Sequence, residues 1–202
     1  MKLFYTKGAC SLVVRIVINE IGLKADFESV DLKSKKTETG RDFYTINHKG
    51  AVPTLQLNNG EILTENAVIL QFLADDSKAT QLLPAVGDYK RYPVLEWLNY
   101  TATEMHKSFG PLFNPAIPQQ LKDDVFIPII KKKLSYINQH LEKNAFLLGD
   151  HFTLPDAYMF VMLFWTTHFK LDLTEWSHLS RYFAALEKRK SIEQSLKEEG
   201  LK

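Results

Sequence analysis

The chain has 202 residues, of which 45% are hydrophobic and 24% are charged. This balance is typical of a globular protein with a sizeable core, and the length suits one large domain or two small ones. Lys and Arg number 25 against 24 Asp and Glu, so the formal net charge is +1, which argues against nucleic acid as a partner. The single cysteine, Cys10, excludes an intramolecular disulfide and fits a reducing compartment.

The sequence gives no sign of a membrane segment or of a metal site. The longest apolar run, Ala157–Trp165, is far shorter than the roughly 20 residues that span a bilayer. The first residues contain no apolar stretch of the signal-peptide kind. We therefore expect a cytoplasmic protein without membrane association. The six histidines show no H-x-x-x-H spacing and no Gly-rich phosphate motif occurs, so neither a metal nor a nucleotide is expected.

The first elements predict a strand, a helix and a second strand. Residues 2–6 and 26–32 have the composition of short buried strands. The β-branched residues of Leu12–Ile21 favour a strand locally. However, Ser11 is a good N-cap and Gly22 a good residue to end a helix, so we predict a helix between them.

The next segments complete an α/β pattern. Residues 33–47 are polar and are expected to be irregular. The runs 54–57 and 61–64 flank an Asn59-Gly60 pair, which is a strong hairpin signal. Residues 65–75 have helical apolar spacing. The predicted order is a strand, a helix, a strand, the polar crossing segment 33–47, a hairpin and a helix. This is the order of a thioredoxin-like domain.

The rest of the chain is predicted to be helical. A linker is expected at 77–88, and the later helices are expected at 89–109, stopped by Gly110-Pro111, at 119–143 with a kink at Pro128, at 153–169 and at 175–190. The fold class is therefore an α/β thioredoxin-like N-terminal domain, residues 1–77, plus an all-α C-terminal domain, residues 88–202.

Thr153 and Asp156 predict a capping box at the start of the most apolar helix. Phe152 precedes the cap and can pack against Ala157, four positions into the helix. We interpret this motif as part of the folding machinery, without a catalytic role.

Cys10 follows a strand and precedes a helix. A thiol at a helix N-terminus has a lowered pKa and is reactive. The alternative is a buried structural cysteine. Position 13 is Val, so there is no C-x-x-C pair. A disulfide of Cys10 would need an external thiol, for which glutathione is the abundant candidate.

Two further patterns, at Val52–Pro53 and at Glu65, each have two interpretations. A cis Val52–Pro53 bond would expose the Val52 backbone to an extended peptide, whereas a trans bond would only start a strand. Glu65 opens a helix and could bind an ammonium group, or it could serve in capping.

Asn99, Thr103 and His106 share a predicted helix face. Such a polar stripe is either a ligand-facing wall or a solvated surface. The spacing does not separate the two.

Together these segments resemble the beta class of bacterial glutathione S-transferases. The matching stretches are Met1–Tyr5, Gly8–Ser11, Ser29–Leu32, Asn47–Pro53, Leu63–Glu65, Glu96–Tyr100, Thr103–Lys107, Phe152–Tyr158 and Glu199–Lys202. The resemblance implies an N-terminal domain that binds glutathione, a helical domain that supplies the pocket for a second substrate, and a homodimer. Arg15 stands where many close relatives have His, and Asn66 where the superfamily often has Ser.

The resemblance also implies site residues. Cys10, Ser11 and His106 would favour the glutathione thiolate, and glutathione would be the co-substrate. The implied glutathione-binding residues are Cys10, Lys35, Val52, Pro53, Glu65, Asn66, Asn99, Thr103, Glu104, His106 and Lys107. Among them Val52 would pair with the cysteinyl part, Glu65 and Asn66 with the γ-glutamyl end, and Lys35 with the glycyl side.

The implied function is conjugation of glutathione to small hydrophobic electrophiles. An alternative on the same fold is a glutathione-dependent thiol–disulfide reductase or peroxidase with Cys10 as the mixed-disulfide carrier, and a third is a non-catalytic binding protein. Phe109, Phe113 and Trp165 could line the second-substrate pocket or pack in the core.

Overall fold

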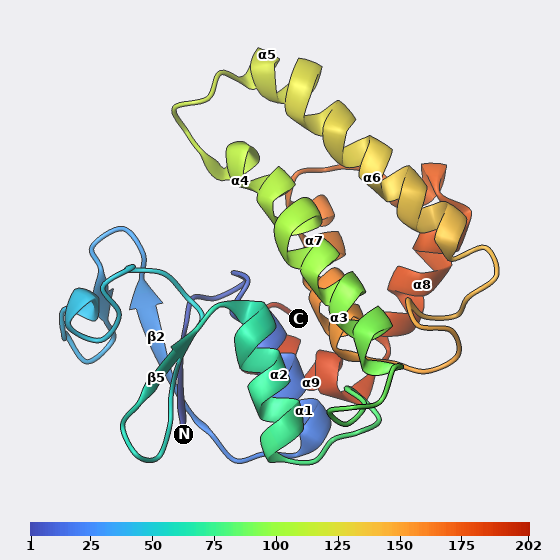
Figure 1. Cartoon of the computed structure of the whole chain (residues 1–202). Coiled ribbons are helices and arrows are strands. Elements are labelled where there is room, and N and C mark those ends of the chain that lie inside the picture. Colours follow the sequence, from blue (N-terminus) through green and yellow to red (C-terminus); the bar gives the residue numbers. More distant parts are fainter. The chain divides into compact units, whose positions relative to one another are not determined.

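The computed structural model describes all 202 residues, which form two compact units (Figure 1). Unit 1 comprises Met1–Thr80 and Arg189–Lys202, and unit 2 comprises Gln81–Lys188. This grouping differs from the predicted domains 1–77 and 88–202, because the last helix of the chain packs within the first unit.

Unit 1 is built on a five-stranded sheet in the order β3-β2-β1-β4-β5. Its strands are β1 (Lys2–Tyr5), β2 (Asp26–Asp31), β3 (Lys36–Thr37), β4 (Thr54–Gln56) and β5 (Ile62–Thr64). Strands β1 and β2 are parallel, and the other neighbours are antiparallel. The predicted hairpin is confirmed, with Gly60 in the left-handed region at φ 88°. This sheet confirms the thioredoxin-like class of the N-terminal part.

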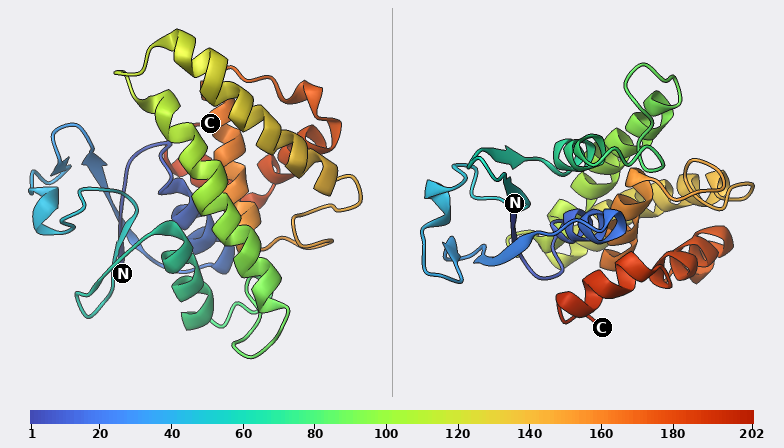
Figure 2. Two further views of the ribbon diagram at one scale, coloured as in Figure 1. Left: turned by 45° about the horizontal axis from the view of Figure 1, so that its top comes forward. Right: turned by 90° about the horizontal axis from the view of Figure 1, so that it is seen from below.

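Three helices belong to unit 1: α1 (Leu12–Ile21), α2 (Asn66–Asp76) and α9 (Lys190–Glu198). Helix α1 packs against both α2 and α9, and Figure 2 shows α1 and α2 side by side. Every residue from Leu12 to Ile18 is buried. Burial on all sides explains why β-branched residues form a helix here, since tertiary packing outweighs local propensity. Gly22 ends the helix at φ 76°, as predicted.

The polar segment 33–47 is more ordered than its composition suggested. It contains β3 and a 3₁₀ turn, Phe43–Thr45. Phe43 is fully buried, its ring lies 5.9 Å from that of Phe4, and both belong to a buried cluster with Val30 and Val52. One aromatic residue in a polar stretch therefore anchors the whole crossing, which the sequence prediction missed.

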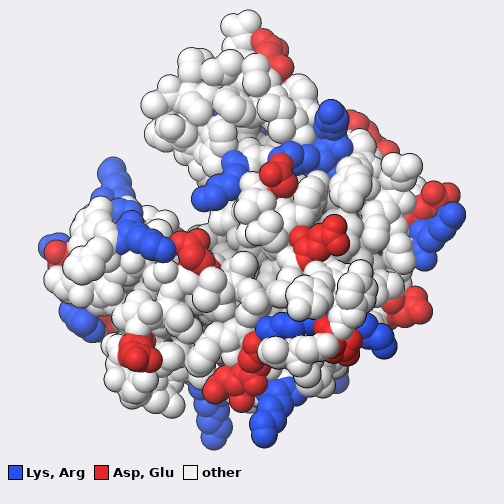
Figure 3. Space-filling model, in the orientation of Figure 1, with Lys and Arg blue, Asp and Glu red and all other residues white.

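Unit 2 contains the helices α3 (Arg91–Tyr100), α4 (His106–Phe113), α5 (Gln119–Leu121), α6 (Ile127–His140), α7 (Leu154–His168) and α8 (Ser177–Glu187). The π-helical turns Thr101–Met105 and Lys122–Phe126 join α3 to α4 and α5 to α6. None of the helices combines the length and the apolar composition needed to cross a membrane. Basic and acidic side chains are interspersed on the face shown in Figure 3.

The prediction that a helix stops at Gly110-Pro111 was wrong, because α4 continues to Phe113. Pro111 removes one backbone N–H donor, and α4 ends two residues after it. Pro128 lies near the start of α6, directly after the π turn Lys122–Phe126, where the regular i→i−4 hydrogen bonding is already interrupted.

Helix α7 is the centre of unit 2, and every residue from Leu154 to Leu163 is buried. Its predicted capping box is confirmed. The buried Asp156 accepts hydrogen bonds of 2.8 Å each from Thr153 N, Thr153 Oγ1 and Tyr182 Oη, and one of 2.9 Å from Leu147 N. Burial raises the pKa of Asp156, and these four donors oppose that rise.

Candidate active site

Cys10 lies in the turn between β1 and α1, as the sequence predicted. Its Sγ donates to the carbonyl oxygen of Val52 at 3.2 Å. Its own carbonyl oxygen accepts from Asn66 Nδ2 at 3.1 Å. The side chain is half-buried. Three segments far apart in the sequence therefore meet at Cys10: the β1–α1 turn, the start of β4 and the start of α2.

Strand register explains why these segments meet. Phe4 lies opposite Thr54, and Thr54 lies opposite Thr64. The chain therefore leaves β1, enters β4 and leaves β5 at one end of the sheet. Glu65 directly follows β5, so this end of the sheet also receives that carboxylate.

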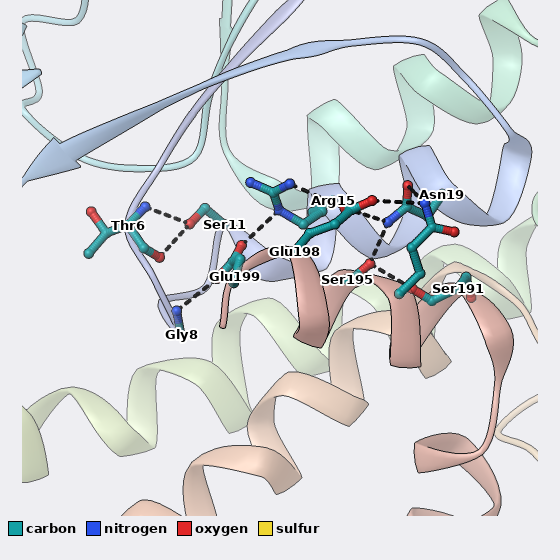
Figure 4. A network of polar contacts seen from close by, with 10 residues as sticks. Thr6, Gly8, Ser11, Arg15, Asn19, Ser191, Ser195, Glu198 and Glu199 are labelled. Atoms are coloured by element: carbon teal, nitrogen blue, oxygen red, sulfur yellow. Dashed lines mark hydrogen bonds and ion pairs between the residues drawn. The ribbon is translucent and has the colours of Figure 1, made fainter. Parts of the chain in front are cut away.

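Ser11 precedes α1 but does not cap it through its side chain, so the predicted capping role was wrong. The hydroxyl is fully buried and closes the turn instead (Figure 4). Ser11 Oγ donates to the Thr6 carbonyl at 3.2 Å and accepts from the Thr6 amide at 3.1 Å. The hydroxyl therefore uses both its donor and its acceptor to hold the backbone that carries Cys10.

A carboxylate from the end of the chain holds the same turn. Glu199, which follows α9, accepts from the Gly8 amide at 2.8 Å and from Arg15 Nε at 3.1 Å (Figure 4). The guanidinium carbon of Arg15 lies 3.7 Å from the ring centre of Phe27 and 4.5 Å from that of Tyr5. Burial raises the pKa of Glu199, while the Gly8 amide and Arg15 oppose the rise.

The segment before β4 is a tight turn that ends in a cis Val52–Pro53 bond, so the predicted cis geometry is confirmed, although the Val52 carbonyl already accepts from Cys10 Sγ. The buried side chain of Asn47 donates to the Ala51 carbonyl at 2.9 Å, and the Gly50 amide donates to the Asn47 carbonyl at 2.8 Å. Lys35 Nζ donates to the Gly50 carbonyl at 2.8 Å. The turn therefore brings the Lys35 ammonium and the Val52 backbone to one small region.

Glu65 is the residue before α2, and its φ of 71° is unusual for a side chain other than glycine. Its exposed carboxylate accepts from Lys49 Nζ at 2.7 Å. Backbone strain of this kind is concentrated at functional sites.

The other predicted residues lie in unit 2, around the π turn Thr101–Met105. A π turn inserts one extra residue, so Asn99, Thr103 and His106 do not follow simple α-helical spacing. Thr103 Oγ1 donates back to the Asn99 carbonyl at 3.0 Å. The exposed members of this set are Asn99, Thr103, Glu104 and Lys107. Lys133 Nζ lies 2.9 Å from Glu104 Oε2.

His106 is oriented by a tyrosine and by an aromatic cluster. Its Nδ1 lies 2.7 Å from Tyr158 Oη, and its ring centre lies 5.2 Å from that of Trp165. Phe109 and Phe113 both contact Trp165 edge to face. Phe109 is fully buried, whereas 47% of Phe113 is exposed. Phe109 is thus a core residue, and Phe113 offers an aromatic surface.

Comparison with known proteins identifies the family. Residues 8–76 match the model of the glutathione S-transferase N-terminal domain, and residues 100–190 match that of the C-terminal domain. The chain belongs to the glutathione S-transferase family. It is 43% identical over 202 residues to the glutathione S-transferase GstA of Escherichia coli O157:H7, with both chains covered in full.

Solved glutathione S-transferases share the fold. A beta-class enzyme from Sphingomonas chungbukensis superposes with a TM-score of 0.96 at 38% identity. A sphingomonad enzyme complexed with glutathione superposes with a TM-score of 0.95, also at 38% identity. Each comparison covers 100% of both chains. The chain is a glutathione transferase close to the bacterial beta class, and the family uses glutathione as co-substrate.

Proposed function

We propose that this transferase conjugates the thiolate of glutathione to small hydrophobic electrophiles, and that glutathione lies along the sheet end described above. The observation that carries the proposal is the convergence of Cys10, Val52 and Glu65 where β1, β4 and β5 meet. The sulfur would lie beside Cys10 and the cysteinyl backbone against Val52.

The two ends of the tripeptide have chemically suitable partners. The γ-glutamyl end carries an ammonium group, which the Glu65 carboxylate attracts, with Asn66 beside it. The glycyl carboxylate faces a cation, Lys35. The ligand therefore extends between a carboxylate at one end and an ammonium at the other, which fixes its direction in the site.

The reaction needs a glutathione thiolate. The positive end of the α1 dipole lies beside Cys10 and favours a negative sulfur there. The thiolate attacks an electrophilic carbon, a C–S bond forms, and a halide or similar group leaves with its bonding electrons. In this proposal Ser11 acts as a positioning residue, since its hydroxyl is bonded to the Thr6 backbone.

The helical unit is proposed to complete the site. His106, oriented through Tyr158, would act on the glutathione thiolate. The residues Asn99, Thr103, Glu104 and Lys107 would contact glutathione, some of them across a homodimer interface. Phe113 and Trp165 would bound the electrophile pocket. We also propose that the protein works in the cytoplasm.

A second function is favoured by the half-buried Cys10 thiol at a helix start. Cys10 thiolate would attack a glutathionylated thiol, release that thiol as a thiolate, and form a Cys10–glutathione mixed disulfide. A second glutathione thiolate would then attack the mixed disulfide, releasing oxidised glutathione and the Cys10 thiolate.

One variant assayed in two reactions tests both functions. With Cys10→Ala, conjugation to a chromogenic aryl halide should persist within severalfold, while reduction of a glutathionylated peptide should be lost. Loss of both reactions would make Cys10 essential to conjugation and contradict the primary mechanism. Failure of the unchanged protein to conjugate, or to bind immobilised glutathione, would reject the proposed function. Sedimentation that shows only monomer would reject the homodimer.

A further inference from the structure

We propose that Gly50 and Tyr44 form a positioning pair that holds the Lys35 ammonium in place for the glycyl carboxylate. The pair would make the enzyme select glutathione over thiols that lack the glycine. The inference rests on the proposed placement of the glycyl end at Lys35.

Gly50 occupies a position that only glycine fits well. Its φ is +58°, in the left-handed region, and its amide donates to the Asn47 carbonyl at 2.8 Å. Asn47 is itself buried and donates to the Ala51 carbonyl and to Thr54 Oγ1. The direction of the Gly50 carbonyl is therefore set by a rigid turn.

Tyr44 fills the space beside Gly50. A Cβ built on Gly50 would lie 2.6 Å from Tyr44 Cε1 and 3.0 Å from Tyr44 Cζ. Tyr44 is 45% exposed, but the backbone that carries its ring is held in place. The preceding residue, Phe43, is fully buried, and the Tyr44 amide donates to Asp42 Oδ1 at 2.9 Å. The ring thus packs directly on the backbone of the turn.

Lys35 is fixed at both its backbone and its side chain. Its φ of 57° is left-handed, its amide donates to the Asp31 carbonyl, and its carbonyl accepts from the Phe43 amide, each at 2.8 Å. Its Nζ donates to the Gly50 carbonyl at 2.8 Å. An ammonium has three N–H donors. After Gly50 takes one, two remain to bind a carboxylate.

Selectivity follows from this fixed position. A charge-assisted hydrogen bond contributes roughly 10-fold or more in affinity when its geometry is good. In γ-glutamylcysteine the terminal carboxylate lies one residue closer to the sulfur, about 3.5 Å away from the glycyl position. A Lys35 ammonium held by the Gly50 carbonyl cannot follow it without losing that bond.

The test compares two thiols, glutathione and γ-glutamylcysteine, by the ratio of their kcat/KM values with one aryl halide. Gly50→Ala should reduce the preference for glutathione about 10-fold, mainly through the KM for glutathione, because the new Cβ meets the Tyr44 ring. Tyr44→Ala should reduce it severalfold. Tyr44→Phe keeps the ring and should leave the preference unchanged.

The double variant Gly50→Ala/Tyr44→Ala supplies the sharpest comparison. Removing the ring relieves the contact but leaves alanine at the left-handed φ of residue 50, so the preference of the double variant should lie between that of Gly50→Ala and that of Tyr44→Ala. If Gly50→Ala alone is too unstable to assay, Tyr44→Ala and the double variant carry the test. Lys49→Gln is a control at the γ-glutamyl end of the ligand. It removes a contact to Glu65 and should change the KM values of both thiols equally.

Lys35→Met separates this proposal from the function on which it rests. It should abolish the preference for glutathione. If it does so while Gly50→Ala and Tyr44→Ala leave the preference unchanged, the positioning pair is rejected and the proposed site stands. If Lys35→Met leaves the preference intact, the placement of the glycyl end is wrong and the inference falls with it.

Discussion

The turn that carries Cys10 and the start of α7 are each held by a buried carboxylate, but the two carboxylates come from different parts of the chain. Both present backbone amides to a buried carboxylate: Glu199 accepts from Gly8, and Asp156 accepts from Thr153 and Leu147. Asp156 comes from the first turn of the helix that it caps. Glu199 comes from the far end of the chain and is paired with the buried cation Arg15.

The difference indicates what each carboxylate does. A local carboxylate with neutral donors stabilises the helix that it caps. A remote carboxylate ties the stability of unit 1 to the geometry of the turn beside the reacting sulfur. Changes at Asp156 should therefore act mainly on folding and leave the KM for glutathione unchanged, and changes at Arg15 or Glu199 should affect both folding and glutathione binding.

The largest expected effect is at Asp156. Asp156→Ala leaves buried donors at Thr153, Leu147 and Tyr182 without an acceptor, and it should cost roughly 3–5 kcal/mol of unfolding free energy. Urea denaturation measures this loss. Tyr182→Phe is the matched control, which removes one donor and should cost about 1 kcal/mol. The KM for glutathione of the folded fraction should not change, and a large rise would contradict the division of roles.

Arg15→Met should lower the free energy of unfolding by about 3 kcal/mol, because it leaves the buried Glu199 without its cation. Unlike Asp156→Ala, it should also raise the KM for glutathione severalfold, since the Gly8 amide and the Cys10 turn lose their fixed support. Steady-state kinetics below the melting temperature measure this effect. Lost stability with an unchanged KM would show that Glu199 does not position the turn.

Glu28 is a third buried carboxylate. It lies in unit 1, as Glu199 does, but like Asp156 it has only a structural role. Burial tends to raise the pKa of Glu28, but hydrogen bonds from Thr39, Lys2 and Thr37 lower it to about 2 from 4.5. The contribution of the Glu28 carboxylate to the free energy of unfolding is therefore complete above pH 4.5 and is lost as the pH falls to about 2.

Glu28→Gln should consequently cost about 1–3 kcal/mol at pH 7, and almost nothing near pH 2. Unfolding curves of both proteins across this range measure the difference. The KM for glutathione at pH 7 should stay the same. A stability difference that is independent of pH would mean that the Glu28 charge does not act through these bonds.

The smallest expected effect is stabilising and lies in unit 2. Gly110 is inside α4, and a Cβ built on it meets nothing within 4 Å. Gly110→Ala should add about 0.5–1 kcal/mol because alanine favours the helix. Thermal unfolding measures the gain, and a loss of stability would contradict a continuous helix at this position.

The sequence predicted the elements that depend on local signals. Gly22, the Asn59-Gly60 hairpin and the Thr153–Asp156 cap are set by neighbouring residues, and all were confirmed. Glu199 and Gly8 are 191 positions apart, so no local pattern could reveal their contact. Phe43 and Tyr44 were visible only as two adjacent aromatic residues in a polar stretch, and nothing in the sequence showed that Phe43 is the buried one.

The site was predicted through resemblance to a family more than through local chemistry. Position alone placed Cys10 at a helix start, and the structure adds its contacts with Val52 and Asn66. The π turn at Thr101–Met105 could not be predicted, because α and π turns differ by one inserted residue without a sequence signature.

A crystal structure of the protein with glutathione tests the central claim most directly. We predict that the glutathione sulfur lies beside Cys10, the cysteinyl backbone on Val52, the γ-glutamyl end at Glu65 and the glycyl carboxylate on Lys35. Glutathione bound in the reverse direction, or at another end of the sheet, would contradict it.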